Sequence, residues 1–364
     1  MNNILNILTN FHLAYAIISI FVCYVLLQFV IKNAANLMLI DIPNDRASHV
    51  IPTPSSGGLV LVLTLPFLFI NQLSPSLDIL VLSMFFLGFV GFVDDRIDLS
   101  SKVKFLAQII VAVTFYFFDI KVKSLYGLFG IYELNEFLSF SLTMFLIVGI
   151  INAYNLIDGI NGLLGSLSLL NLVIFVFTFS ELNDGLFIII LFVGMFLISF
   201  LRFNFGKAKI FMGDTGSLPI GVLFSFLFIS LFNENNSGSS SSLFLILFPC
   251  LDMVRLFASR IKNKKSPFKA DKNHYHHLLL KFRNNHLIAT VICLALQIAI
   301  FFACYIISSY KNFVAATFIT LAVSLLIFVV AEGLLAIKNK NDIKINNEEL
   351  NKLNKNKRLL INNK

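Results

Sequence analysis

Acidic and amide side chains form clusters in an otherwise apolar chain. Asp94, Asp95 and Asp98 follow one apolar run, and Lys104 opens the next. Asp214 lies in a Gly-Asp-Thr-Gly-Ser sequence. A pair of carboxylates can bind a divalent cation or hold one carboxyl with a raised pKa, because close like charges disfavour joint ionisation. Glycines beside an aspartate let the backbone approach an anion, and Mg²⁺ prefers one or two carboxylates plus phosphate oxygens.

A further cluster is the polar stretch from Asn152 to Gly165, which lies between two long apolar runs. Hydrocarbon cannot satisfy polar groups, so this loop must lie in protein or in a water-filled cavity. Asn155 offers a neutral oxygen that can complete metal coordination or orient a phosphate. Asp158 has two interpretations, a catalytic carboxylate or a cap of the helix that begins near Ile160.

The composition indicates the elements that position these residues. Hydrophobic residues make up 57% of the 364 residues and charged residues 13%, against about 25% charged in soluble domains. We therefore predict an all-α polytopic integral membrane protein with ten or eleven transmembrane helices. Apolar runs that cross, or nearly cross, a hydrocarbon core of about 30 Å lie at 11–31, 58–72, 77–93, 103–119, 138–153, 163–180, 186–201, 210–232, 243–259, 286–309 and 313–336.

The basic residues indicate the orientation of these helices. If the amino terminus lies outside, every Lys and Arg except Lys121, Lys123 and Lys311 falls in a cytoplasmic segment. The polar clusters fall on that same side. On the outer side, residues 121–137 alternate apolar and polar residues, which predicts a short periplasmic hairpin. We expect one transmembrane domain over 1–337 and a basic cytoplasmic tail over 338–364.

A histidine-rich segment follows the run at 243–259. His274, His276 and His277 lie close to several lysines, and as a set they predict an anion-binding loop. Any one of them alone is equally well explained as a solvated surface histidine. Asp252 and Arg255 share one helix face at a spacing of three residues and predict an ion pair that braces this loop.

Simpler interpretations compete at two of these places. The acidic pair Asp94–Asp95 can be a solvated helix end or a partner of Arg96. The segment 41–58 contains three prolines that favour extended backbone, so it is either a linker or a wall of the same site. Its mixture of an arginine, a histidine and aspartates favours the wall.

The ordered motifs resemble those of a known family. They are Asp-Asp-x-x-Asp, Asn-x-x-Asn-x-x-Asp-Gly-x-x-Gly-Leu, Gly-Asp-x-Gly-Ser and Ser-Pro-Phe-x-x-Asp-x-x-His-x-His-His, spread over about residues 41–285. This order resembles the polyprenyl-phosphate N-acetylhexosamine-1-phosphate transferases. The resemblance implies that a UDP-amino sugar gives its sugar-1-phosphate to polyprenyl (undecaprenyl) phosphate at the cytoplasmic face. It also implies release of UMP and a Mg²⁺ cofactor that Mn²⁺ can replace.

The resemblance also implies roles for individual residues. It assigns Asp214 and Asn155 to the metal and the diphosphate, Lys104 to a phosphate, and Asp94 or Asp95 to positioning or deprotonating the lipid phosphate. Asp158 joins the catalytic candidates, with its capping interpretation still open. The three histidines are assigned to the donor, and Asp98 is grouped with them as a substrate-binding residue.

Two departures from the family pattern bear on the substrate. Asn161 stands where many members have aspartate, and its carboxamide suits hydrogen bonding to a uracil edge, with Phe211 as a stacking face. Ser55 and Ser56 stand where relatives often place an arginine. The run 43–49 resembles the transferases that start O-antigen or other surface-polysaccharide chains.

We therefore expect a multi-pass transferase of the bacterial inner membrane with a cytoplasmic active site. Its expected partners are the UDP-amino sugar, polyprenyl phosphate and the lipid bilayer, with no nucleic acid; a homodimer is compatible with the sequence. The donor sugar stays open, with N-acetylglucosamine as the default. The alternative is a transporter or flippase of lipid-linked sugars, which would place coupling residues near the bilayer midplane and show paired halves. The clusters here are interfacial and no repeat is present.

Overall fold

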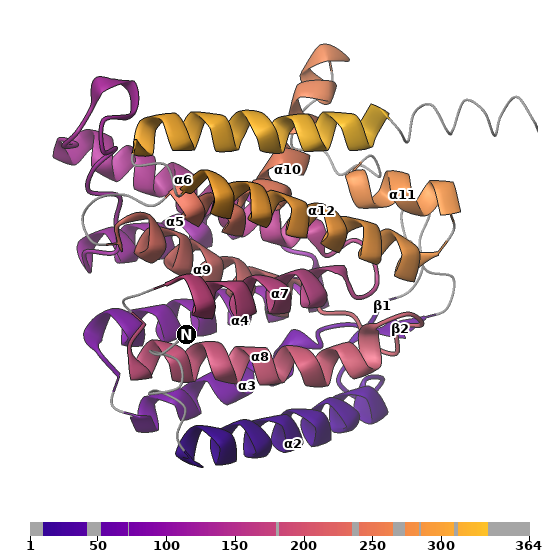
Figure 1. The fold of residues 1–364 in the computed structure, drawn as a ribbon. Coiled ribbons are helices and arrows are strands. Elements are labelled where there is room, and N and C mark those ends of the chain that lie inside the picture. The colour runs from indigo at the N-terminus through magenta and orange to yellow at the C-terminus, as the bar shows by residue number, and fades with distance from the viewer. Residues whose placement is uncertain are drawn as a thin grey trace, which may run out of the picture.

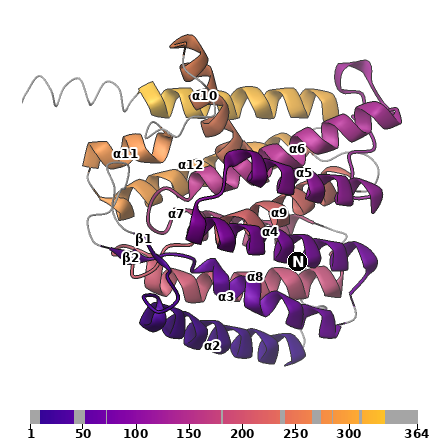
Figure 2. The same cartoon turned by 180° about the vertical axis from the view of Figure 1, so that it is seen from behind.

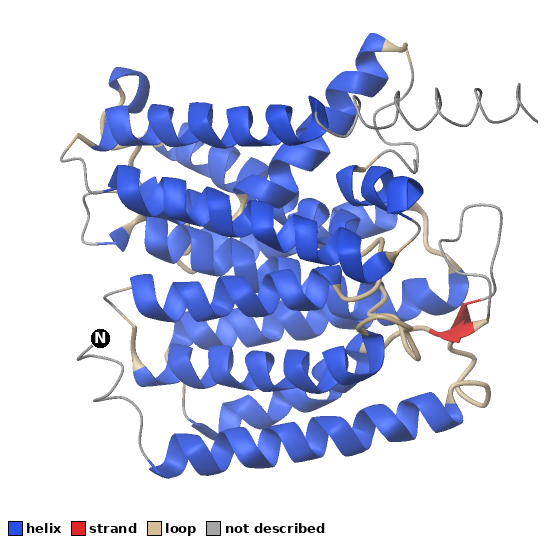
Figure 3. Ribbon diagram, turned by 45° about the vertical axis from the view of Figure 1, so that its right-hand side comes forward, coloured by secondary structure: helices blue, strands red, loops and turns tan. Residues whose placement is uncertain are grey.

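Helices form almost all of the described chain. The computed structural model describes residues 10–41, 52–71, 73–179, 182–234, 240–264, 274–283, 285–308 and 312–333. Within them, strands β1 (Ile40–Asp41) and β2 (Thr53–Pro54) pair antiparallel at one end of the molecule (Figure 3). The predicted all-α polytopic architecture is confirmed.

Long apolar helices account for seven of the expected membrane-crossing runs. They are α2 (Asn10–Asn33), α4 (Pro75–Ile97), α6 (Glu136–Ile157), α8 (Asp184–Asn204), α9 (Asp214–Phe232), α12 (His286–Ser308) and the helix Phe313–Gly333. Two further apolar helices are shorter, Gly58–Phe69 and α7 (Leu163–Thr178). The first consists of α3 (Gly58–Thr64) and the start of the 3₁₀ helix Leu65–Asn71.

The remaining two expected runs take other forms. α5 (Ser101–Phe117) has 17 residues and carries Lys102 and Lys104 in its first turn. The run at 243–259 is divided between a 3₁₀ turn, Ser240–Leu245, and α10 (Leu247–Lys262). α10 stands steeply across the other helices, and its far end projects from the bundle (Figure 1). A mixed polar and apolar sequence suits such a helix better than a straight crossing.

α9 lies at the centre of the bundle, packed against α3, α4 and α6. Glycines permit these contacts. A Cβ added to Gly58 would lie 2.1 Å from the nitrogen of Gly216, and one added to Gly221 would lie 2.7 Å from the Cα of Ile151. A Cβ on Gly91 would lie 2.3 Å from a carbonyl oxygen of α9. Small residues let helix backbones approach where lipid provides no hydrophobic drive.

The helix ends that carry the polar clusters meet at one end of the bundle. α4 and α6 end there, while α5 and α9 begin there, and β1, β2 and the short helix α11 (Tyr275–Arg283) lie at the same end (Figures 1 and 2). The predicted hairpin lies at the opposite end, where Ser124 and Glu133 form an isolated antiparallel bridge. The predicted tail and the run 43–49 lie outside the described residues.

Substitution of Gly221 by alanine tests the packing of α9 against α6. The added Cβ meets backbone that cannot rotate away, so we expect the free energy of unfolding to fall by about 1–3 kcal/mol. Gly149→Ala in α6 is the matched control, because its added Cβ meets nothing within 4 Å. Thermal unfolding in detergent measures both variants, and equal midpoints would contradict the packing described above.

Candidate active site

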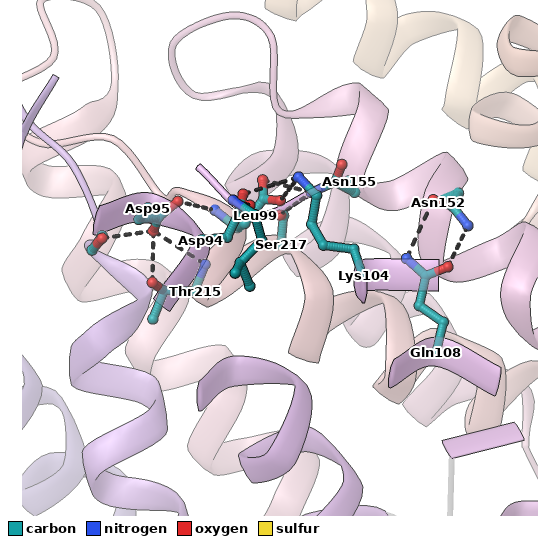
Figure 4. Close-up of polar contacts among 11 residues, drawn as sticks. Asp94, Asp95, Leu99, Lys104, Gln108, Asn152, Asn155, Thr215 and Ser217 are labelled. Carbon is teal, nitrogen blue, oxygen red and sulfur yellow. Dashed lines mark hydrogen bonds and ion pairs between the residues drawn. The ribbon is translucent and has the colours of Figure 1, made fainter. Parts of the chain in front are cut away.

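Asp95, in the last turn of α4, holds the first turn of α9. Its Oδ1 accepts the N–H of Asp214 at 2.9 Å, and its Oδ2 accepts the N–H and the hydroxyl of Thr215 at 3.2 and 2.6 Å (Figure 4). The hydroxyl of Ser56 donates to Oδ2 at 2.6 Å. The first N–H groups of a helix lack partners within the helix, and negative charge is stabilised there. Asp95 therefore caps α9 from a different helix.

Lys104 connects the other two carboxylates of the cluster. Its Nζ donates to Oδ2 of Asp94 at 2.9 Å and to Oδ2 of Asp214 at 3.1 Å. The other oxygen of Asp94 accepts the N–H of Leu99 at 2.8 Å (Figure 4). One ammonium group therefore compensates two carboxylates from different helices, and the role of Lys104 in binding phosphate stays a prediction.

Asn155, in the last turn of α6, binds α9 on its other side. Its Nδ2 donates to Oδ1 of Asp214 at 2.9 Å and to Oγ of Ser217 at 2.8 Å. Ser217 is fully buried. The structure thus brings together the two residues predicted as metal ligands.

The acidic cluster can share one cation. One carboxylate oxygen from each of Asp94, Asp95 and Asp214 lies within 4.8 Å of the others. Oxygen ligands and several negative charges suit Mg²⁺ or Mn²⁺. Asp95 already accepts four hydrogen bonds, which uses most of its acceptor capacity. Asp94 and Asp214 are therefore the better placed carboxylates for an ion.

A polar cavity of about 480 Å³ opens beside the cluster. Seven of the residues predicted for the site line it, together with Asn204 and residues of the β1–β2 segment. The lining consists of Ile40, Asp41, Ser55, Asp95, Asn155, Asp158, Gly159, Ile160, Asn161, Asn204, Phe211, Gly213, Asp214 and His277. The segment 41–58 thus forms part of a wall where it is described; residues 42–51 lie outside the described residues.

Asp158 does not cap the helix that follows it. α7 begins at Leu163, and its N-cap residue Gly162 makes no side-chain cap, whereas Asp158 is the residue at which α6 ends. Burial, followed by the negative charges of Asp214 and Asp95, raises the pKa of Asp158 to about 8. Of the two interpretations, the geometry favours a carboxyl group that faces the cavity.

Asn161 and Phe211 lie on the same cavity, as predicted. The side-chain Nδ2 of Asn161 donates to the carbonyl of Gly206 at 2.8 Å. The backbone carbonyl of Asn161 accepts a hydrogen bond from the hydroxyl of Thr290 at 2.9 Å. The carbonyl of Phe211 accepts the N–H of Gly57 at 2.7 Å. Both side chains are therefore carried on backbone that other segments hold in place.

The three histidines divide into two groups. His277 lines the cavity, whereas His274 and His276 are buried behind it. Burial and the neighbouring His277 lower the pKa of His276 well below its ordinary value. The predicted ion pair between Asp252 and Arg255 is confirmed, at 3.1 Å. Only one of the three predicted histidines is thus placed to touch a ligand in the cavity.

Asp98 and Arg96 lie away from this cavity. Asp98 is exposed and ends α4 in a left-handed conformation with φ of 52°. The structure therefore does not place it with the substrate-binding candidates. Arg96 donates to the carbonyl of Leu37 at 3.0 Å instead of pairing with the acidic cluster. The counter-charge for that cluster is Lys104.

Two amide side chains near the cluster form a pair that the sequence did not predict. Gln108 and Asn152 exchange two hydrogen bonds, at 3.3 and 2.6 Å, and tie α5 to α6 (Figure 4). Gln108 lies one turn from Lys104, and Asn152 lies one turn from Asn155. Both are polar residues inside apolar helices, and each lies three or four residues from a predicted site residue. This spacing could have identified them in the sequence.

Comparisons with known proteins agree with this geometry. The model of the family described as glycosyl transferase family 4 matches residues 77–232. An undecaprenyl-phosphate alpha-N-acetylglucosaminyl 1-phosphate transferase of Salmonella typhi is 31% identical over 73% of this chain and 76% of the relative. A decaprenyl-phosphate N-acetylglucosaminephosphotransferase of Mycobacterium leprae is 31% identical over 70% of this chain and 73% of the relative.

The chain belongs to glycosyl transferase family 4, the polyprenyl-phosphate N-acetylhexosamine-1-phosphate transferases. A probable undecaprenyl-phosphate N-acetylglucosaminyl 1-phosphate transferase of Bacillus subtilis is also similar, at 29% identity over 76% of this chain and 79% of the relative. The range matched by the family model includes the acidic cluster, Lys104, Asn155 and the loop after α6. This family member is therefore an enzyme of the phosphoglycosyltransferase class, and a transporter is not favoured.

Replacement of Asp95 by alanine tests its role as the cap of α9. Four donors lose their acceptor, so we expect the free energy of unfolding to fall by about 2 kcal/mol. Asp98→Asn is the control, because Asp98 is exposed and asparagine tolerates a left-handed backbone. The measurement is the thermal midpoint in detergent. If Asp95→Ala unfolds at the same temperature as Asp98→Asn, the capping role is wrong.

The pKa of Asp158 predicts a dependence of stability on pH. The unfolded carboxyl loses its proton near pH 4, whereas the folded one keeps it up to about pH 8. The folded state thus binds more protons in this window, so this group lowers stability as pH rises through it. We expect Asp158→Asn to flatten the fall of the thermal midpoint across this window, without added metal. Parallel curves for the variant and the wild type would exclude this effect.

Proposed function

We propose that this enzyme transfers an N-acetylhexosamine-1-phosphate from a UDP-sugar to polyprenyl phosphate, releases UMP, and starts a cell-envelope polysaccharide. The observation that carries the proposal is the bridge from Lys104 to Asp94 and Asp214 beside a polar cavity at the helix ends. The names of the relatives, which act on undecaprenyl or decaprenyl phosphate, support the acceptor and favour N-acetylglucosamine as the sugar.

The location of the site suits two substrates from different phases. The cluster lies where apolar helices end, so a nucleotide sugar can enter from water while a polyprenyl chain stays in the bilayer. The basic residues Lys121 and Lys123 lie at the opposite end, beyond the end of α5. They are two of the three basic residues that the sequence places outside. The excess of Lys and Arg on the side of the site supports a cytoplasmic active site in the bacterial inner membrane.

The proposed reaction moves one phosphoryl group. An oxygen of polyprenyl phosphate attacks the phosphorus that carries the sugar, and the bond from this phosphorus to the bridging oxygen breaks. The bridging oxygen leaves with UMP. Such a transfer depends on positioning and charge neutralisation more than on covalent help from the protein.

The chain's own residues divide this work. Lys104 would bind a phosphate once one of its carboxylate partners turns to a ligand. Asp94, which caps no helix, is the better candidate than Asp95 for orienting or deprotonating the lipid phosphate. Asp214 and Asn155, with Asp94, would hold Mg²⁺ or Mn²⁺. When bound, this cation would neutralise the negative charge that develops on the diphosphate.

The loop after α6 and Phe211 supply the proposed donor wall. Asn161 presents an amide that matches the hydrogen-bonding edge of uracil, and Phe211 presents an aromatic face on the same cavity. Asp158 and His277 complete this wall. Asn161 donates to the carbonyl of Gly206 and accepts from the hydroxyl of Thr290, and Phe211 accepts from the N–H of Gly57; these hydrogen bonds fix both residues in the wall.

Purified protein with polyprenyl phosphate and a panel of labelled UDP-N-acetylhexosamines tests the proposal. We expect UMP release with Mg²⁺ or Mn²⁺, its loss on dialysis against a chelator, and its return with the metal. Asp214→Ala should lower turnover roughly 100-fold or more, because it removes a ligand of the cation that would neutralise the reacting phosphates. Asp119→Asn is the control, since Asp119 pairs with Lys121 and Lys123 at the other end. Equal turnover of Asp214→Ala and Asp119→Asn would refute the assignment.

A further inference from the structure

α11 carries His277 to the cavity, and its first turn rests on one buried carboxylate. Asp252, in α10, is 2% exposed. Its Oδ1 accepts the N–H of Tyr275 at 2.8 Å, and its Oδ2 lies 2.9 Å from Nδ1 of His274. A single side chain of α10 therefore binds both the backbone and a side chain at the start of α11.

Arg255 compensates the charge of Asp252, and His276 lies further away. Nη2 of Arg255 lies 3.1 Å from Oδ1, and Nδ1 of His276 lies 3.9 Å from Oδ2. Nη1 of Arg255 also lies 3.2 Å from Oε1 of Glu332, near the end of the helix Phe313–Gly333. A buried carboxylate is tolerated when charges and hydrogen bonds surround it in this way. Asp252 itself does not line the cavity.

The loop after α6 holds the histidines from the opposite direction. A Cβ added to Gly159 would lie 2.3 Å from Nε2 of His276 and 2.9 Å from Nε2 of His277. The two imidazole rings lie 4.4 Å apart between centroids. The histidine pair is thus seated between Asp252 on one side and the backbone beside Asp158 on the other.

We propose that Asp252 is a positioning residue for the transfer reaction, which acts through α11 to hold His277 at the cavity wall. The inference rests on the proposed function, because it assigns His277 to contact with the donor. Without the carboxylate, the Tyr275 N–H and Arg255 would lose a buried acceptor, which is costly. The start of α11 would then move away from α10, and His277 would move away from the donor.

A double-mutant cycle separates this role from a purely structural one. We expect Asp252→Ala and His277→Ala each to lower kcat/KM for the UDP-sugar roughly 10- to 100-fold, as misplaced groups do. The double variant should lose no more than the worse single variant, because both changes remove the same contact. Multiplied losses in the double variant would show that Asp252 does not act through His277 and would overturn the inference.

Hydrogen exchange of the segment 274–283 provides a readout that needs no activity. In detergent, Asp252→Ala should increase exchange in this segment and leave α4 and α9 unchanged. Asp184→Asn is the matched control, since Asp184 lies 3.2 Å from His12 in another aspartate–histidine pair, at the first turn of α8. Unchanged exchange in Asp252→Ala would overturn the inference whatever the activity.

A conservative variant covers the case in which Asp252→Ala does not fold. Asp252→Asn keeps an oxygen for Tyr275 N–H and Arg255, but it removes the negative charge and presents an amide group to His274. It should show an intermediate rise in exchange and an intermediate loss of kcat/KM, and wild-type values for both would overturn the inference. If the wild type releases no UMP with any donor, the proposed function fails while the exchange experiment still decides the role of Asp252 in holding α11.

Discussion

The contact between the last turn of α4 and the first turn of α9 determines the geometry of the whole site. Gly91 lets the two backbones touch, and Asp95 accepts the N–H groups with which α9 begins. Asp214 takes part in both contacts through its backbone, and Asp94 is the chain neighbour of Asp95. Helix packing and capping therefore set the separation of the two carboxylates, and Lys104 bridges them. A rotation of either helix would move Asp94 away from Asp214 and at the same time break the hydrogen bonds from the start of α9 to Asp95.

Charge compensation explains how this cluster persists in an apolar bundle. Like charges at such short range repel strongly where water is scarce. Lys104 supplies a full positive charge, Asn155 supplies amide hydrogens, and the start of α9 supplies its positive dipole end. These groups come from α5, α6 and α9, and Asp94 and Asp95 come from α4. The charges are therefore compensated only when these four helices pack together. The amide pair Gln108–Asn152 joins α5 to α6 one turn further into the bundle.

The sequence alone predicted the class of fold and most of the cavity wall, because apolar length and clustered polar residues are local signals. It placed Asp214 with Asn155 and Asn161 with Phe211, and the structure brings each pair to one cavity. It did not show that α10 stands across the bundle, since this follows from packing between distant helices. It also grouped Asp98 with the site, although this left-handed residue at the end of α4 is exposed and does not line the cavity. Gln108 was missed because a single polar side chain in an apolar run does not indicate its contact. Ser56 and Ser217 lie in motifs, but the sequence did not predict their contacts with Asp95 and Asn155.

The enclosure of α9 has a consequence for how this scaffold could be redesigned. Its backbone touches three neighbouring helices through glycines, so the interior offers no room for new side chains. The cavity rim is assembled differently, from the β1–β2 segment, the loop after α6 and α11, which are far apart in the sequence. Directed evolution of donor preference should therefore draw its beneficial changes from these rim segments, which can be exchanged one at a time while the phosphate-handling centre stays intact.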